Sequence, residues 1–280
     1  MPTVGDVLHR AAAELEAAGI DGARLDAEVL LAEALRVGRA HLLALLNERI
    51  DGGAAAAFEA LLARRLAHEP TAYIVGRREF YGIEFACTPA ALIPRPETEM
   101  LVGIALDATR RRRSPLTVAD VGSGSGAVAI AIAANAPGAR LIGTDTSPDA
   151  LRLARANARR AGARVEFVRT TLLRGLRRAD VIVANLPYIP EDDWRALPPE
   201  IRDHEPREAL VGGAHGTEAI DALLAEAPAV LAPGGVLAAE VGDGQAGHVA
   251  QVARAAFPEA AVSVHDDLAG LPRVVLVMPA

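Results

Sequence analysis

The feature that most constrains the fold is an alternation of short apolar segments with helical patterns from about residue 99 to the end of the chain. The apolar segments are rich in β-branched residues, as strands are, and most are separated by an amphipathic stretch. Strands connected through helices need crossover connections, so they form a mainly parallel sheet with helices on both faces. The last two strands are joined by a short loop and should form an antiparallel edge. The seven predicted strands cover residues 116–121, 140–144, 165–168, 181–184, 236–241, 261–264 and 274–278, and the clearest helices cover 127–135, 148–161 and 217–231.

Residues 3–70 show helical periodicity only. Thr3 is a suitable cap for a first helix and Gly19 ends it, and three more helices follow, which predicts a small helical bundle. The bundle contains no cluster of reactive polar residues, so partner docking and plain structural support are both open interpretations. Its apolar residues at helical spacing are Val4, Val7, Leu8, Ala11, Ala12, Leu15, Leu25, Val29, Leu30, Leu31, Leu35, Leu42, Leu43, Leu46, Phe58, Leu61, Leu62 and Leu66.

The periodicity changes between Tyr73 and Pro96. Aromatic and apolar residues are interrupted there by glycines and prolines, which predicts a β-hairpin followed by a rigid loop. The sequence therefore divides into a helical domain over residues 1–72, a connector over 73–98 and a sheet domain over 99–280.

Composition excludes several functions. All 29 basic residues other than histidine are arginine, so the chain lacks the lysine that Schiff-base and pyridoxal enzymes and the Walker A loop require. Aromatic residues make up only 3% and the formal net charge is −7, which argues against a nucleic-acid-binding surface. The one basic run, Arg110 to Arg113, is interpreted as the solvated end of a helix before Ser114.

The single cysteine, Cys87, excludes an intramolecular disulfide and a multi-cysteine zinc site. The histidines have no metal-ligand spacing, so no metal is predicted. The chain shows no basic-then-apolar signal pattern and no uninterrupted apolar run of about 18 residues. We therefore expect a cytoplasmic protein that does not enter a membrane.

A glycine-rich loop follows the first predicted strand and leads directly into an apolar helix. Its alternate glycines allow a sharp turn and close approach of a ligand to the free amides of the helix, although a simple strand-to-helix turn would use the same residues. Asp145 ends the second strand, 23 positions after Gly122, near the spacing at which a carboxylate binds ribose hydroxyls. Asp145 could also cap the following helix, but Ser147 suits that role better. The predicted nucleoside-binding residues are Gly122, Ser123, Gly124, Ser125, Gly126 and Asp145.

A second polar segment, Asn185-Leu186-Pro187-Tyr188, follows the fourth strand. Because the carboxyl ends of parallel strands meet at one edge of the sheet, we expect it in the same crevice as the glycine loop. Asn185 offers one acceptor and two donors, Pro187 fixes a backbone carbonyl, and Tyr188 supplies a flat apolar face. This set suits a planar amide or amino group whose hydrogens are held by acceptors.

The four residues from Asn185 to Tyr188 resemble the Asn-Pro-Pro-Tyr motif of S-adenosylmethionine-dependent methyltransferases that act on amide or exocyclic amino nitrogens. The block Ile93-Pro94-Arg95-Pro96-Glu97-Thr98-Glu99 is similar, more narrowly, to the HemK/PrmC family, as are Glu205-Pro206-Arg207 and Gly212-Gly213. The resemblance implies a Rossmann-like class I methyltransferase domain after the helical domain. Leu186 stands where the family motif has its first proline.

The resemblance also implies an activity, methyl transfer from S-adenosyl-L-methionine to the glutamine of the Gly-Gly-Gln loop of class 1 peptide chain release factors. Asn185, Pro187 and Tyr188 would be catalytic, and Leu186 would join them in substrate binding. Arg95 and Thr98 would contact cofactor or substrate, or only stiffen their loop. The cofactor residues it implies are Gly122, Ser123, Gly124, Ser125, Gly126, Asp145, Leu172 (beside Thr171) and Asn185.

Other functions fit parts of the pattern. A nicotinamide-dependent oxidoreductase explains the glycine loop and Asp145 but gives no reason for the segment from Asn185 to Tyr188. A nucleic-acid amino methyltransferase shares that segment but fits the acidic charge poorly. A glutamine methyltransferase acting on a ribosomal protein, and a scaffold that binds no cofactor, complete the alternatives.

Overall fold

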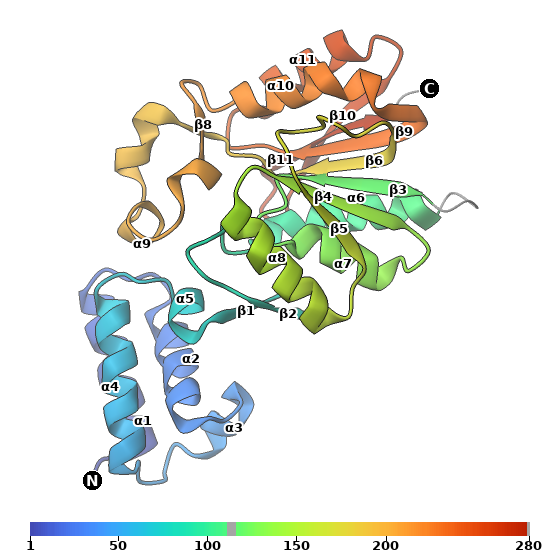
Figure 1. The fold of residues 1–280 in the computed structure, drawn as a ribbon. Coiled ribbons are helices and arrows are strands. Elements are labelled where there is room, and N and C mark those ends of the chain that lie inside the picture. The colour runs from blue at the N-terminus through green and yellow to red at the C-terminus, as the bar shows by residue number, and fades with distance from the viewer. Residues whose placement is uncertain (111–115, 279–280) are drawn as a thin grey trace. The chain divides into compact units, whose positions relative to one another are not determined.

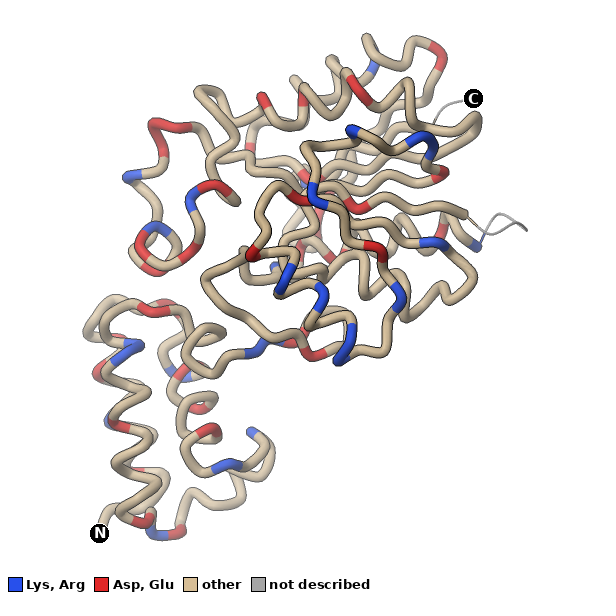
Figure 2. The backbone as a smooth tube through the Cα atoms, viewed as in Figure 1, with Lys and Arg blue, Asp and Glu red and all other residues tan. Residues whose placement is uncertain are grey.

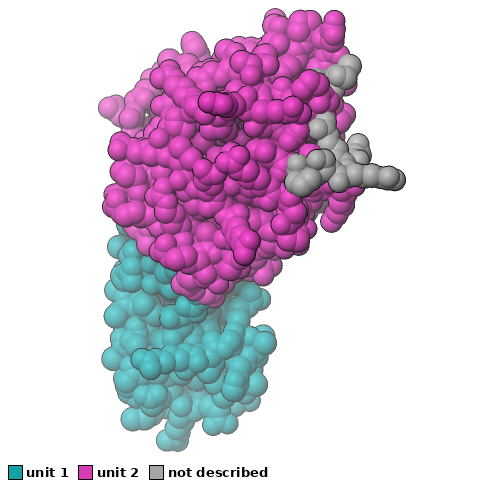
Figure 3. Space-filling model, turned by 45° about the vertical axis from the view of Figure 1, so that its right-hand side comes forward, with its two compact units in different colours: residues 1–77, 198–204 teal, residues 78–197, 205–280 magenta. Residues whose placement is uncertain are grey.

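The computed structural model describes residues 1–110 and 116–278 and divides into two compact units. The first unit comprises Met1–Arg77 and Pro198–His204, and the second comprises Arg78–Leu197 and Glu205–Ala280 (Figure 3). The chain therefore passes from one unit to the other three times.

The first unit is a helical bundle, as the periodicity predicted. Thr3 begins its first helix with a capping box, in which the Thr3 hydroxyl accepts from the Asp6 amide at 3.1 Å and the Asp6 carboxylate accepts from the Thr3 amide at 2.9 Å. Two of the apolar residues at helical spacing lie outside the core, because Leu25 and Leu43 are 47% and 48% exposed. The helices of this unit are α1 (Val4–Ala17), α2 (Ala23–Leu35), α3 (Arg39–Ala44), α4 (Gly52–Leu66), α5 (Thr71–Val75) and α9 (Pro199–Arg202).

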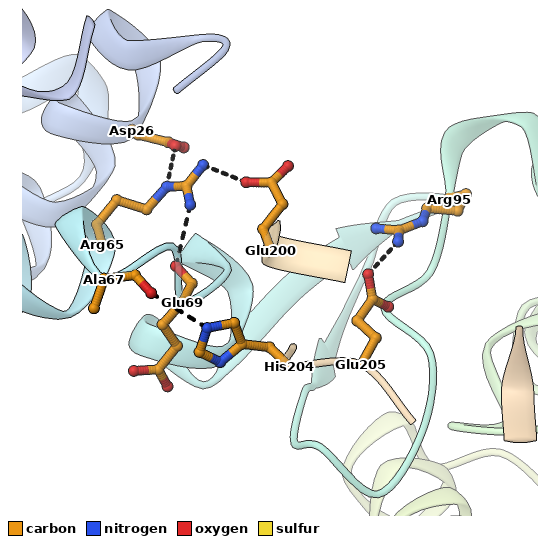
Figure 4. Close-up of polar contacts among 8 residues, drawn as sticks. All are labelled: Asp26, Arg65, Ala67, Glu69, Arg95, Glu200, His204 and Glu205. Atoms are coloured by element: carbon orange, nitrogen blue, oxygen red, sulfur yellow. Dashed lines mark hydrogen bonds and ion pairs between the residues drawn. The ribbon is translucent and has the colours of Figure 1, made fainter. Parts of the chain in front are cut away.

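A buried arginine holds α9 within this unit. Arg65 is 3% exposed, and its Nε donates to Asp26 at 2.6 Å while one terminal nitrogen donates to Glu200 at 2.5 Å (Figure 4). The other terminal nitrogen donates to the Glu69 carbonyl at 3.3 Å. A guanidinium removed from water is stable only with such partners, so Arg65 ties residues 198–204 to helices that precede them by more than a hundred positions.

The second unit contains the predicted seven-stranded sheet. Its strand order is β10-β11-β9-β6-β3-β4-β5, with β11 antiparallel to both of its neighbours and the other pairs parallel. The antiparallel edge predicted for the last two strands is thus confirmed. The strands are β3 (Thr117–Val121), β4 (Arg140–Asp145), β5 (Val165–Arg169), β6 (Ala179–Ala184), β9 (Leu231–Glu240), β10 (Ala261–Asp266) and β11 (Pro272–Met278).

Helices cover both faces of the sheet, with α6, α7 and α8 on one face and α10 and α11 on the other (Figure 1). Two helices match the predicted ranges 127–135 and 148–161, but the helix predicted over 217–231 ends at Glu226. Pro228 follows within a 3-10 turn, since proline lacks the amide that would continue the helix. The helices are α6 (Glu99–Arg110), α7 (Ala127–Asn135), α8 (Pro148–Ala161), α10 (Glu218–Glu226) and α11 (Ala246–Ala256), with 3-10 turns η1 (Pro96–Thr98), η2 (Glu191–Ala196), η3 (Arg207–Ala209) and η4 (Ala227–Ala229).

Two small sheets accompany the large one. The predicted hairpin is formed by β1 (Arg77–Phe80) and β2 (Ile83–Ala86), whereas Tyr73 lies in α5 instead of the hairpin. The second small sheet was not predicted, and it pairs β7 (Ile189–Pro190) with β8 (Val211–Gly213) in parallel.

Acidic and basic residues are interspersed along the described chain (Figure 2). In that part of the chain, no helix is both long and apolar enough to cross a membrane. Helix α6 ends at Arg110, and Arg111, Arg112, Arg113 and Ser114 of the predicted solvated run lie outside the described residues.

Candidate active site

The order of the strands determines where the site lies in the sheet. Strand β3 is central, β4 continues the sheet on one side, and β6 lies on the other. At such a reversal the loops after two neighbouring parallel strands separate and leave a crevice. The loop after β3 is the glycine loop and the loop after β6 begins with Asn185, so the topology brings the two predicted segments together.

The glycine loop needs its glycines. Gly122, Gly124 and Gly126 all have left-handed backbone angles, with φ of 76°, 53° and 81°. A Cβ on Gly122 would also lie 2.8 Å from Cδ2 of Leu186. The leucine that departs from the family motif therefore packs directly on the glycine loop.

A cavity of about 250 Å³ lies at this crevice. Most of the predicted site residues line it, together with the loop that precedes α6. Gly126, which caps α7, and Tyr188 are not among the residues that line it. The predicted residues in its lining are Gly122, Ser123, Gly124, Ser125, Asp145, Thr171, Leu172, Asn185, Leu186 and Pro187, joined by Arg95 and Thr98.

Asp145 contacts the glycine loop directly. Its Oδ2 accepts from the Gly124 amide at 2.8 Å, and its Oδ1 accepts from the Ser147 amide at 2.9 Å. Ser147 caps α8 with its own side chain, as predicted. A carboxylate has about four acceptor positions, so Asp145, which lines the cavity, keeps acceptor capacity beyond these two bonds.

Leu172 has a left-handed backbone with φ of 49°, which a branched side chain seldom adopts. Its carbonyl accepts from the Thr144 hydroxyl at 3.0 Å, and the Glu226 carboxylate accepts from the next amide at 3.1 Å. These bonds hold the strained turn at the edge of the cavity, where such strain often marks a ligand site.

Asp120 is buried beneath the glycine loop at 2% exposure. Its Oδ2 accepts from the Ala129 amide at 3.2 Å, in the first turn of α7. Burial raises the pKa of the Asp120 carboxyl to about 7, and this outweighs the bonds that favour the charged form. The signal in the sequence that could have identified Asp120 is an acidic residue within an apolar strand.

Asn185 is held by two residues that sequence reasoning gave no such role. Its Nδ2 donates to the Thr98 hydroxyl at 3.0 Å, and that hydroxyl donates to Oε2 of Glu240 at 2.7 Å. Thr98 and Glu240 are 5% and 1% exposed. Burial raises the pKa of Glu240 to about 7. The signal for Glu240 was a single acid at the end of the apolar strand β9.

The backbone of Pro187 and Tyr188 lies against a second group of glycines. A Cβ on Gly212 would lie 2.2 Å from the Pro187 carbonyl oxygen, and a Cβ on Gly216 would lie 2.2 Å from the Tyr188 carbonyl oxygen. Gln245 donates to that Tyr188 carbonyl at 2.7 Å. Burial raises the pKa of the Tyr188 phenol, so the phenol stays neutral.

Glu205 fixes the loop that precedes α6. It is 5% exposed, accepts from the Ile93 amide at 3.0 Å and pairs with Arg95 (Figure 4). Ile93 and Arg95 both line the cavity. The motif containing Glu205 is recognisable in the sequence, but its partner Ile93, 112 positions earlier, is not predictable from local pattern.

Comparison with known proteins identifies two domains in the chain. Residues 6–76 match the family model described as the PrmC N-terminal domain, and residues 118–204 match a methyltransferase domain. A methyltransferase structure from Pyrococcus furiosus superposes with a TM-score of 0.54, covering 79% of this chain and 96% of that one at 17% identity, which shows a shared fold.

Two relatives are much more similar in sequence. The chain is 41% identical to a release factor glutamine methyltransferase of Geobacter sulfurreducens, over 87% of this chain and 86% of the relative. It is 42% identical to one of Moorella thermoacetica over 98% of both chains. The resemblance to the HemK/PrmC family is thereby confirmed, and the chain belongs to the release factor glutamine methyltransferase family.

Proposed function

We propose that the protein transfers a methyl group from S-adenosyl-L-methionine to the side-chain amide nitrogen of the glutamine in the Gly-Gly-Gln motif of class 1 peptide chain release factors. The observation that carries the proposal is one cavity lined by the glycine loop, Asp145 and Asn185. The names of the relatives support a glutamine of a release factor as the substrate. Release factors act on ribosomes, so we place the enzyme in the cytoplasm.

The cavity suits a nucleoside cofactor in three respects. The left-handed glycines let the cofactor approach the backbone of residues 122–126, and Asp145 retains acceptor positions for ribose hydroxyls. Leu172 offers an apolar surface for the base. S-adenosyl-L-methionine supplies an electrophilic methyl group when it is bound.

The residues proposed to bind the substrate follow the carboxyl end of β6. In our proposal Oδ1 of Asn185 and the Pro187 carbonyl accept the two hydrogens of the glutamine amide, and Leu186 and Tyr188 contact its side chain. An amide nitrogen is a poor nucleophile because its lone pair is delocalised into the carbonyl. Fixing its direction can therefore supply much of the rate, since orientation effects reach about 7–11 kcal/mol in favourable cases. No base is needed before transfer, because the proton can leave afterwards.

Incubation of the full chain with methyl-labelled S-adenosyl-L-methionine and a purified release factor tests the proposal. Label should enter the wild-type release factor and be absent when the Gly-Gly-Gln glutamine is replaced by alanine. A purified ribosomal protein with exposed glutamines serves as the control substrate. Equal labelling of the altered release factor, or preferential labelling of the ribosomal protein, would contradict the proposed substrate.

Asp145→Ala should weaken the binding of S-adenosyl-L-methionine about 10-fold or more, because a charged hydrogen bond contributes roughly 1.5–3 kcal/mol. Titration calorimetry measures this directly. Asp149→Ala is the matched control, since Asp149 is an exposed carboxylate on α8. Equal affinities of the two variants would rule out the ribose assignment.

A further inference from the structure

Asn185 and Glu240 lie at the ends of neighbouring strands. Strands β6 and β9 pair in parallel with Ala184 opposite Ala239, so Asn185 and Glu240 are the next residues on adjacent strands. Thr98 contacts both of them from η1, at 3.0 Å and 2.7 Å. Three segments that are distant in sequence thus form one hydrogen-bonded chain beside the cavity.

This chain has a direction. A threonine hydroxyl has one hydrogen. When Glu240 is ionised, Thr98 donates that hydrogen to Glu240 and can therefore only accept from Asn185. The Asn185 amide must then present Nδ2 to Thr98. Its Oδ1, at the other end of the same planar group, accepts no hydrogen bond from the described residues 1–110 and 116–278, and Asn185 lines the cavity.

We infer that Thr98 and Glu240 are positioning residues for methyl transfer, because their hydrogen-bond chain fixes the Asn185 amide with its oxygen directed at the substrate amide. The inference rests on the proposed function, in which Asn185 Oδ1 accepts a substrate hydrogen. Without these hydrogen bonds, the Asn185 amide could turn over and present Nδ2, a donor, to the substrate hydrogen that Oδ1 has to accept. The reaction would then lose its alignment while the cofactor site stayed intact.

The charge state of Glu240 supports the inference. An ionised Glu240 can only accept, whereas a protonated one can donate to Thr98 and release the Thr98 hydrogen toward Asn185 Oδ1. Burial is the main cause that raises the pKa of Glu240 to about 7, and Glu97 raises it further, while Thr98, Arg273 and Arg95 lower it. The pKa of the Tyr188 phenol is raised mainly by burial and in addition by the charge of Glu240. The accepting form therefore predominates above about pH 7, and kcat should fall as the pH drops through that value.

Thr98→Val keeps the shape of the side chain and removes the hydroxyl. We expect kcat for release factor methylation to fall roughly 10-fold or more, with an unchanged dissociation constant for S-adenosyl-L-methionine by calorimetry. Thr98→Ser retains the hydroxyl and should recover most of the loss. Thr109→Val is the matched control, because the Thr109 hydroxyl donates to the Leu106 carbonyl of its own helix at 2.7 Å and Thr109 does not line the cavity. A Thr98→Val enzyme with wild-type kcat would overturn the inference.

Glu240→Gln tests the direction of the chain, because a glutamine amide can donate to Thr98. We expect a similar loss of kcat, normal cofactor binding, and loss of the wild-type decline in kcat below about pH 7. A wild-type pH profile in this variant would overturn the inference. The proposed function can fail independently of this inference. An active Asn185→Ala enzyme would contradict the proposed role of Asn185. An inactive Asn185→Ala enzyme together with an active Thr98→Val enzyme would contradict only the positioning role of Thr98 and Glu240.

Discussion

Asn185→Ala should reduce the turnover of release factor methylation by roughly 10²-fold or more, while the affinity for S-adenosyl-L-methionine changes little. The amide that directs the substrate nitrogen is removed, and misplacement of reacting atoms by about 1 Å is enough for an effect of this size. The glycine loop and Asp145, by contrast, keep their own contacts. Single-turnover methylation, followed with labelled cofactor, measures the effect without interference from product release.

The matched control is Asn135→Ala. Asn135 is an exposed residue at the end of α7, and its side chain donates to the Ala131 carbonyl of its own helix at 2.9 Å, away from the cavity lining. Its turnover should stay near the wild-type value. Comparable turnover in Asn185→Ala and Asn135→Ala would remove Asn185 from the mechanism.

Gly212→Ala should also cause a large loss of turnover, although Gly212 does not line the cavity. The added methyl would lie 2.2 Å from the Pro187 carbonyl oxygen and 2.5 Å from the Gly216 carbonyl oxygen. Both are backbone atoms, so no side-chain rotation relieves the overlap, and the segment from Asn185 to Tyr188 must shift. We expect turnover to fall by roughly 10²-fold and the melting temperature to fall by several degrees, as overpacking of about 1–3 kcal/mol predicts.

Gly103→Ala provides the comparison for that variant. Gly103 lies within α6, and a Cβ there meets no other atom within 4 Å. Alanine is favoured over glycine inside a helix by about 0.5–1 kcal/mol, so this variant should be at least as stable as the wild type and fully active. Release factor methylation and thermal unfolding, measured on both variants, separate the steric effect from the loss of a glycine. A Gly212→Ala enzyme as active as Gly103→Ala would show that the Pro187 backbone does not have to be held in place.

Local signals explain why much of the second unit was predictable. Helix α8 has Ser147 as its N-cap and Pro148 as its first residue, and it ends before Gly162, which has a left-handed backbone conformation. Each of these start and stop signals can be recognised from a few neighbouring residues. The convergence of Gly122 and Asn185 follows from a general rule for parallel sheets. Neither prediction needed the partner of any side chain.

The hydrogen bonds that hold the site residues in place were not predictable in this way. Thr98 and Glu240 are 142 positions apart, and Glu205 meets Ile93 across 112 positions. Such contacts exist only once the sheet has formed, and no periodicity encodes them. The prediction for Leu25 was wrong for a different reason. Its apolar side chain fits the helical spacing, but it is exposed, and Ala23 and Ala27 are on the buried face of α2.

The buried Arg65 makes the helical unit discontinuous along the chain. Its partner Glu200 belongs to a segment of seven residues that is encoded far downstream of the helices. A chain cut after Arg77 would leave this arginine without one of its two carboxylates, and a buried guanidinium that loses a partner is destabilising. Any exchange of the helical unit between relatives, by recombination or by design, therefore has to carry two separate stretches of sequence together.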